Sequence, residues 1–173
     1  KLDREPTADE VWQSIDNCNK YDEIVFCGYG EPTLRLDVIK TVSKKIKDAG
    51  GKVRLNTNGH GNVINKRNIL PELKGLVDSI SISLNADTEE AYDRIVRPLP
   101  GLRNGIYDKV KEFIEEAKKY IPEVQSTIVT HQEGVDEEIC EEISKNEFDV
   151  KYRPRRYNIV GEFDLDKLTH GKI

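Results

Sequence analysis

The sequence of 173 residues contains no methionine and only three cysteines. Because no start codon can lie within it, we expect it to be a piece of a longer protein. Cys18, Cys27 and Cys140 are too few and too scattered for a disulfide framework, and they include no CxxC pair of the zinc-binding kind. We therefore interpret all three as reduced thiols that serve packing, with only Cys27 close to the candidate site described below.

Long apolar runs and a large excess of one charge are also missing. No run approaches the roughly 18 apolar residues that a membrane span requires, and no signal sequence is present. The 27 basic and 32 acidic residues give a net charge of -5, which offers no overall attraction to nucleic acid. We expect a cytoplasmic protein with no membrane partner and no clear nucleic-acid partner. Without a linker or low-complexity break, residues 1–173 are expected to form one domain.

Predicted strands alternate with predicted helices along the chain. Short apolar stretches indicate strands, and apolar residues at helical spacing fill the segments between them. The expected strands are 23–28, 53–58, 77–85, 125–130 and 149–160, and the expected helices are 7–18, 38–46, 69–73, 88–95, 110–121 and 135–143. This alternation favours right-handed βαβ crossovers and a parallel sheet.

The two faces of the expected strands differ in polarity. In residues 79–85 apolar side chains at even positions alternate with serines and Asn85 at odd positions. In the last strand Lys151, Arg153, Arg155 and Tyr157 share a face. A strand covered by helices on both sides should be apolar on both faces. We therefore predict a partial parallel (β/α) barrel with helices outside and a polar, ligand-sized interior; an ordinary open sheet with one solvated face is the alternative.

The stretch CGYGEPTLR, residues 27–35, follows the first expected strand. Ligands bind at this end of the strands in parallel α/β proteins. Gly28 and Gly30 let the backbone carbonyls approach a ligand closely because no Cβ intervenes, and Glu31 adds a carboxylate. Such acceptors suit an ammonium group. The alternative is a tight strand-to-helix turn with an exposed Glu31.

Three segments in register carry a family resemblance. GYGEP at 28–32, NTNG at 56–59 and SISLN at 81–85 lie in order, one βα unit apart, and resemble the radical S-adenosylmethionine (SAM) superfamily. The resemblance implies that Gly28, Tyr29, Gly30 and Glu31 bind the amino group of SAM, with Tyr29 in place of the more usual second glycine.

The same resemblance assigns the next two strand ends. It implies that Thr57 and Asn58 lie beside the SAM site and that Ser83 and Asn85 contact the ribose or the methionine carboxylate. Each of these four residues could instead be a helix cap or turn residue. With RPLPG at 97–101, the segments are similar to the subgroup of radical SAM proteins often encoded beside TatD-type nucleases.

The resemblance also implies two cofactors, SAM and an iron-sulfur cluster, and residues 1–173 lack the motif that binds the cluster. Radical SAM enzymes bind a four-iron four-sulfur cluster through CxxxCxxC after the first barrel strand, and no cysteines here match that motif. The cluster loop and first strand are therefore expected before Lys1, which leaves a partial barrel missing its first strand, with SAM-binding residues but no metal ligands. Such a fragment is expected to be inactive alone and to self-associate through the exposed edge strand.

Four further residues are candidates for substrate binding. His60 follows the NTNG segment and His131 follows the fourth expected strand, although a solvated loop histidine is the alternative for His131. Arg153 and Arg155, together with Lys151 and Arg156, could bind a carboxylate or phosphate. Alternating basic residues equally suit the protection of an exposed edge strand.

These observations lead to one expected function and two alternatives. The full-length protein is expected to cleave SAM reductively, taking electrons from a donor such as flavodoxin or ferredoxin, and to generate a deoxyadenosyl radical that abstracts hydrogen from an unknown substrate. The first alternative is a cluster-free binding or regulatory module for a nucleotide or small anion. An aldolase-like enzyme would need a Schiff-base lysine or metal ligands at the strand ends, and we find no such set.

Overall fold

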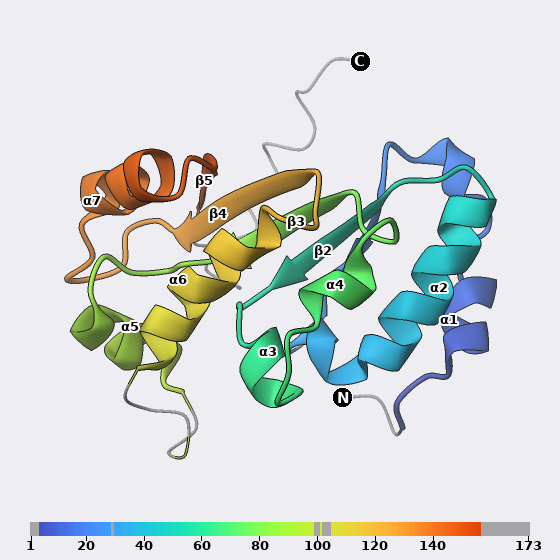
Figure 1. Ribbon diagram of the computed structural model, residues 1–173, viewed down its shortest axis with the longest axis horizontal. Coiled ribbons are helices and arrows are strands. Elements are labelled where there is room, and N and C mark those ends of the chain that lie inside the picture. The colour runs from blue at the N-terminus through green and yellow to red at the C-terminus, as the bar shows by residue number, and fades with distance from the viewer. Residues whose placement is uncertain (1–3, 29, 99–100, 102–104, 157–173) are drawn as a thin grey trace, which may run out of the picture.

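The computed structural model describes residues 4–28, 30–98, 101 and 105–156. Five parallel strands pair in chain order, β1-β2-β3-β4-β5 (Figure 1). They are β1 (Ile24–Phe26), β2 (Val53–Thr57), β3 (Ser79–Ser83), β4 (Glu123–Val129) and β5 (Lys151–Arg155). The predicted parallel α/β fold is confirmed, although the last strand is shorter than expected: Arg156 is outside it, and residues 157–160 lie outside the described residues.

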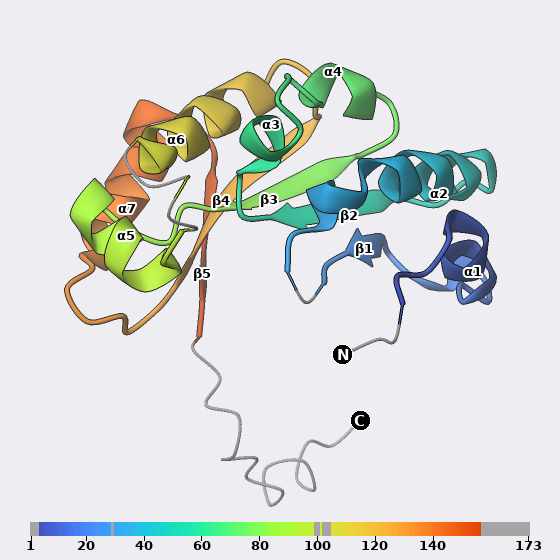
Figure 2. The ribbon, with the colours of Figure 1, turned by 90° about the horizontal axis from the view of Figure 1, so that it is seen from below.

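The helices precede the first strand or connect successive strands. They are α1 (Ala8–Gln13), α2 (Leu36–Asp48), α3 (Gly61–Ile64), α4 (Leu70–Leu73), α5 (Glu89–Val96), α6 (Ile106–Ala117) and α7 (Glu137–Glu142), with 3-10 turns at Cys18–Lys20 and Pro32–Arg35 and a π-helical turn at Ile143–Glu147. Right-handed crossovers that always advance in one direction place every helix on the same face of the sheet. Figure 2 shows this arrangement, a bent sheet with α2 to α7 on its convex side. The fold is thus part of a parallel barrel.

The hydrophobic core fills the space between the convex face and these helices. Val53, Leu55, Ile80 and Ile82 of β2 and β3 are completely buried there. The facing helices contribute apolar side chains at helical spacing, namely Ile39, Val42, Ile46, Val110, Phe113 and Ile114. The alternate side chains of the strands are polar and face the concave side, as the sequence pattern predicts. No helix of the described part of the chain is long and apolar enough to cross a membrane.

The cysteines depart from expectation in two ways. The helix expected over residues 7–18 begins after a capping box of Thr7 and Glu10 but ends at Gln13, so Cys18 lies in the following 3-10 turn and not on that helix. Cys18 and Cys140 are nevertheless buried, as a packing role requires. Cys27 is exposed, so its expected packing role is wrong. Cys27 follows the short strand β1, which pairs only with β2 among the described residues and so forms one edge of the sheet.

Candidate functional site

The carboxylate of Glu31 joins the ends of β1 and β2. Its Oε1 accepts hydrogen bonds from Thr33, through the backbone N–H at 3.0 Å and the hydroxyl at 2.6 Å, and from the Thr57 hydroxyl at 2.7 Å. Its Oε2 accepts from the backbone N–H of Asn58 at 2.7 Å. Glu31 is only 9% exposed, which excludes the alternative of an exposed turn residue. A carboxylate removed from water needs such donors, so this one fixes the two loops against each other.

The backbone beside Glu31 faces open space. Among the described residues, a Cβ added at Gly28 or Gly30 would meet no heavy atom within 4 Å other than those of its chain neighbours. Gly30 has φ +108°, a region that side chains with a Cβ rarely adopt. A ligand can therefore approach this turn to backbone distance, as the sequence suggests. Tyr29, the third predicted residue of the turn, lies outside the described residues.

The loop after β2 is held by its own polar side chains and by the core. The Thr57 hydroxyl also accepts from the N–H of Gly59 at 3.1 Å, and the Asn58 Oδ1 accepts from the N–H of His60 at 2.9 Å. Gly59 has φ +82°, and a Cβ there would lie 3.0 Å from Val110 and 3.1 Å from Ile82. The NTNG segment is therefore a tightly packed platform beside Glu31.

The end of β3 contributes a further polar group to this edge of the sheet. The Oγ of Ser83 lies 3.5 Å from the Thr127 Oγ1, and the Asn85 N–H donates to the Thr127 carbonyl at 3.3 Å. Asn85 has φ +61°, a left-handed conformation that asparagine tolerates well.

Two acceptors near these loops have no partner. The Oδ1 atoms of Asn56 and Asn85 are buried without a hydrogen bond among the described residues. Buried polar groups are normally satisfied, so these two amide oxygens fit a bound molecule that presents hydroxyl or ammonium donors. The amino acid and ribose parts of SAM carry both kinds of donor, and the residues present fit that group.

Aromatic side chains that the sequence reasoning missed brace the same loops from the core. His60 is buried, and its Nε2 shares a hydrogen bond of 2.7 Å with the Tyr92 hydroxyl. The Tyr92 ring packs against Tyr107 with centroids 5.4 Å apart, and the Tyr107 hydroxyl donates to the Ala86 carbonyl at 2.9 Å. These contacts connect the loop after β2 to the loop after β3. The hydrogen bond to Tyr92 occupies the Nε2 of His60. None of these contacts tests whether His60 touches a substrate, so that contact stays a prediction.

The other predicted residues lie farther along the sheet. The side chain of His131 is 85% exposed, and its Nδ1 is 3.8 Å from Glu137. Arg153 and Arg155 are exposed on β5. The register of the strands places both arginines on the concave face, which also carries Ser83.

The cysteines of this chain do not fit an iron-sulfur cluster. Within the described residues no group of three or more histidine, cysteine, aspartate or glutamate side chains could hold a metal ion. Cys18 and Cys140 are buried, and burial raises the pKa of the Cys140 thiol to about 12, which opposes thiolate formation. Cys27 alone is exposed near the Glu31 turn.

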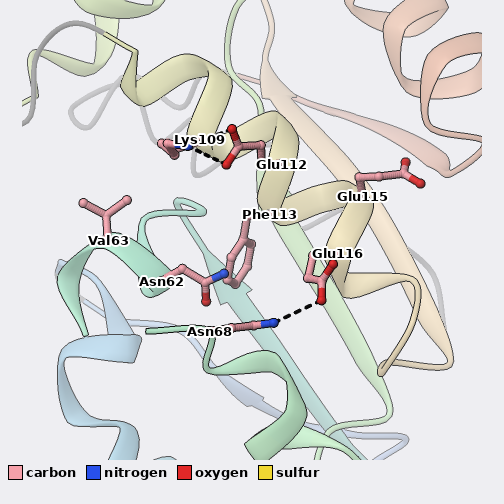
Figure 3. A pocket seen from close by; sticks show the side chains of 8 residues that line it. All are labelled: Asn62, Val63, Asn68, Lys109, Glu112, Phe113, Glu115 and Glu116. Carbon is pink, nitrogen blue, oxygen red and sulfur yellow. Dashed lines mark hydrogen bonds and ion pairs between the residues drawn. The ribbon is translucent and has the colours of Figure 1, made fainter. Parts of the chain in front are cut away.

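A groove on the outer helical layer contains none of the predicted site residues. It has a volume of about 410 Å³ and lies between the α3 region and α6 (Figure 3). Its carboxylates are paired within the chain: Glu112 with Lys109, Glu115 with Lys118 and Glu116 with Asn68. The strand ends around Glu31 are therefore the better candidate site.

The buried His60 predicts a pH dependence of stability. Burial lowers its pKa below 6.5, and the nearby Glu31 charge acts in the opposite direction with less effect. The unfolded chain then binds more protons than the folded chain as the pH falls below 6.5, so stability present at higher pH is lost. We expect the free energy of unfolding, measured by urea titration, to decrease between about pH 7 and about pH 5.5.

His60→Gln should remove part of that decrease, whereas His131→Gln, which changes an exposed histidine, should keep it. Arg67 and Lys40 hold the pKa of Glu72 at about 2, below its ordinary value of 4.5. The contribution of Glu72 to stability is therefore lost only below pH 4.5, outside the pH range of this measurement. Equal pH slopes for the wild type and His60→Gln would contradict this account of His60.

Comparison with known proteins gives two matches. The family model described as the radical SAM superfamily matches residues 1–145. An uncharacterized protein of Methanocaldococcus jannaschii is 33% identical over 113 residues, which are 65% of this chain and 36% of that protein. The chain thus spans about a third of the length of this relative. Since the family model covers most of the 173 residues, and its match agrees with the parallel partial barrel, the chain belongs to the radical SAM superfamily.

Proposed function

We propose that the ends of β1, β2 and β3 bind SAM, and that the full-length protein is a radical SAM enzyme acting on a substrate not yet known. One observation carries the proposal. The buried Glu31 carboxylate holds two loops in place beside an open glycine turn, while Asn56 and Asn85 keep acceptors without partners among the described residues. Family membership implies SAM-cleaving radical chemistry in general.

Each part of the cradle has a distinct role in this proposal. Backbone carbonyls at Gly28 and Gly30 accept hydrogen bonds from the SAM ammonium group, which has three donors. The Oε2 of Glu31 accepts one hydrogen bond in the structure, so it has capacity for another. Ser83 and Asn85 orient the ribose or the methionine carboxylate. Thr57 and Asn58 act through Glu31 by holding its carboxylate in place.

The chemistry also requires groups that these residues do not supply. When bound beside a reduced four-iron four-sulfur cluster, SAM supplies a deoxyadenosyl radical for hydrogen abstraction. The described cysteines do not fit such a cluster, so we propose that its ligands come from other parts of the longer protein. An electron donor of the flavodoxin or ferredoxin type, membership of the TatD-associated subgroup and self-association through the β1 edge belong to the same proposal.

Glu31→Gln tests the cradle directly. The variant keeps the size of the side chain but places an amide NH₂ where one carboxylate oxygen accepts hydrogen bonds, so the loops lose their fixed geometry. We expect SAM affinity, measured by calorimetry on the folded chain, to fall at least roughly tenfold, as loss of a charge-assisted hydrogen bond usually does.

Glu133→Gln is the matched control, because Glu133 is exposed and its side chain has no ion pair among the described residues. It should bind SAM as the wild type does. Equal affinities of the wild type and Glu31→Gln would contradict the proposed site.

The enzyme class is tested on the longer natural protein after anaerobic reconstitution with iron and sulfide. We expect bound iron and sulfide together with reductant-dependent release of deoxyadenosine from SAM. A protein that binds neither iron nor sulfide and cleaves no SAM would contradict the enzyme proposal and favour a cluster-free binding module.

A further inference from the structure

The concave face of β5 carries two arginines in register with the proposed SAM cradle. The strand pairing aligns Ser83 with Thr127 and Thr127 with Arg153, so these three residues form one row across β3, β4 and β5. Val129 and Arg155 form part of the next row. Neighbouring strands lie roughly 4.8 Å apart, so the Cα of Arg153 is about 10 Å from that of Ser83. A long arginine side chain covers much of that distance.

The positive charge of these arginines is not compensated. Lys151, one row earlier on the same face, lies 3.5 Å from the Glu123 carboxylate. Arg153 and Arg155 have no ion pair or side-chain hydrogen bond among the described residues, and the side chains beside them in their rows, Thr127 and Val129, are uncharged. Among the described residues, the positive charges of β5 without an ion pair therefore lie towards its carboxyl end.

Most other arginines of the described chain have partners. Arg4, Arg35, Arg54 and Arg67 pair with carboxylates, and Arg94 donates to two backbone carbonyls. Arg97 and Arg156 also lack ion pairs within the described part of the chain, but neither belongs to a strand. Two free guanidinium groups on one strand, at the end of the sheet where parallel barrels bind ligands, form a concentrated site for an anion.

We propose that Arg153 and Arg155 bind a carboxylate or phosphate group of the substrate, held on the concave face next to the SAM cradle. Guanidinium forks match the paired oxygens of both anions. The substrate role of this site rests on the function proposed above, because it requires SAM to bind in the neighbouring cradle. The anion site itself rests only on the geometry of β5.

Edge protection is the competing explanation for these arginines. Charged side chains keep an exposed edge strand from pairing with other chains. Pro154 already lies between the two arginines on β5, and it lacks the N–H that a further strand would need. Edge protection also does not account for the register that places Arg153 in one row with Ser83 of the cradle.

The test uses two double variants of the same net charge. Arg153→Gln with Arg155→Gln removes the proposed site, and Lys52→Gln with Lys74→Gln removes two exposed lysines that have no ion pair among the described residues. Inorganic phosphate and acetate serve as probes in separate titrations of the chain, followed by NMR. We expect the affinity for at least one probe to fall at least roughly tenfold in the arginine variant and to stay unchanged in the lysine variant.

Comparison of the two probes distinguishes a phosphate-bearing from a carboxylate-bearing substrate. Equal losses in both variants, or no binding of either anion to the wild type, would overturn the proposal. Titration with SAM separates it from the cradle: SAM affinity should persist in the arginine variant, and its loss would assign the arginines to the methionine carboxylate of SAM and overturn a substrate role. If the arginine variant does not fold, phosphate-induced shifts of the Arg153 and Arg155 Nε–H signals in the wild type decide the question, and absent shifts would refute the site.

Discussion

The buried carboxylate of Glu31 is the interaction on which the geometry of the candidate site depends. A charge in this position is costly unless donors surround it, and Thr33, Thr57 and Asn58 provide four hydrogen bonds from two separate loops. The turn after β1 and the loop after β2 therefore adopt one relative arrangement. The contact between His60 and Tyr92 continues this arrangement into the core.

The partial barrel explains why such a site forms at this edge. Successive crossovers in one direction place the connecting helices on the convex face of the sheet. These helices cover the apolar side chains of β2 and β3, which point to that face. The concave face then carries the polar side chains of these strands, among them Asn56, whose buried Oδ1 has no hydrogen-bond partner among the described residues. Strand ends that lie side by side bring together residues that are far apart in the sequence, such as Glu31, Thr57 and Asn85.

Much of the fold could be predicted from the sequence because β2 and β3 alternate in polarity, the other strands include short apolar stretches, and the longer helices repeat their apolar residues regularly. Short elements could not. Helix α3 has only four residues, too few to show a period. Apolar residues continue at helical spacing after Gln13, yet α1 ends there, so Cys18 was placed on the wrong element. A strand was expected over residues 23–28 with Cys27 in a packing role, but β1 spans only Ile24–Phe26 and Cys27 is exposed.

The turn that carries Glu31 could also be singled out from the sequence as a candidate site, but not the way in which that turn is held. The glycine turn and Glu31 indicate a ligand at the end of β1. The hydrogen bonds from Thr57 and Asn58 to this carboxylate depend on the pairing of β1 with β2. Residue spacing does not reveal that pairing. Tyr92 and Tyr107 were likewise missed, because residue spacing does not identify His60 and Ala86 as the partners of their hydroxyl groups.

The most direct test of this account is an NMR titration of the chain with SAM, with backbone amide signals assigned. The account predicts that the largest shifts occur at Gly28, Gly30, Asn58, Ser83 and Asn85, on the three strand ends joined through Glu31 and its neighbours. Shifts confined to the outer groove around Asn62 and Glu116, or no shifts at saturating SAM, would contradict it.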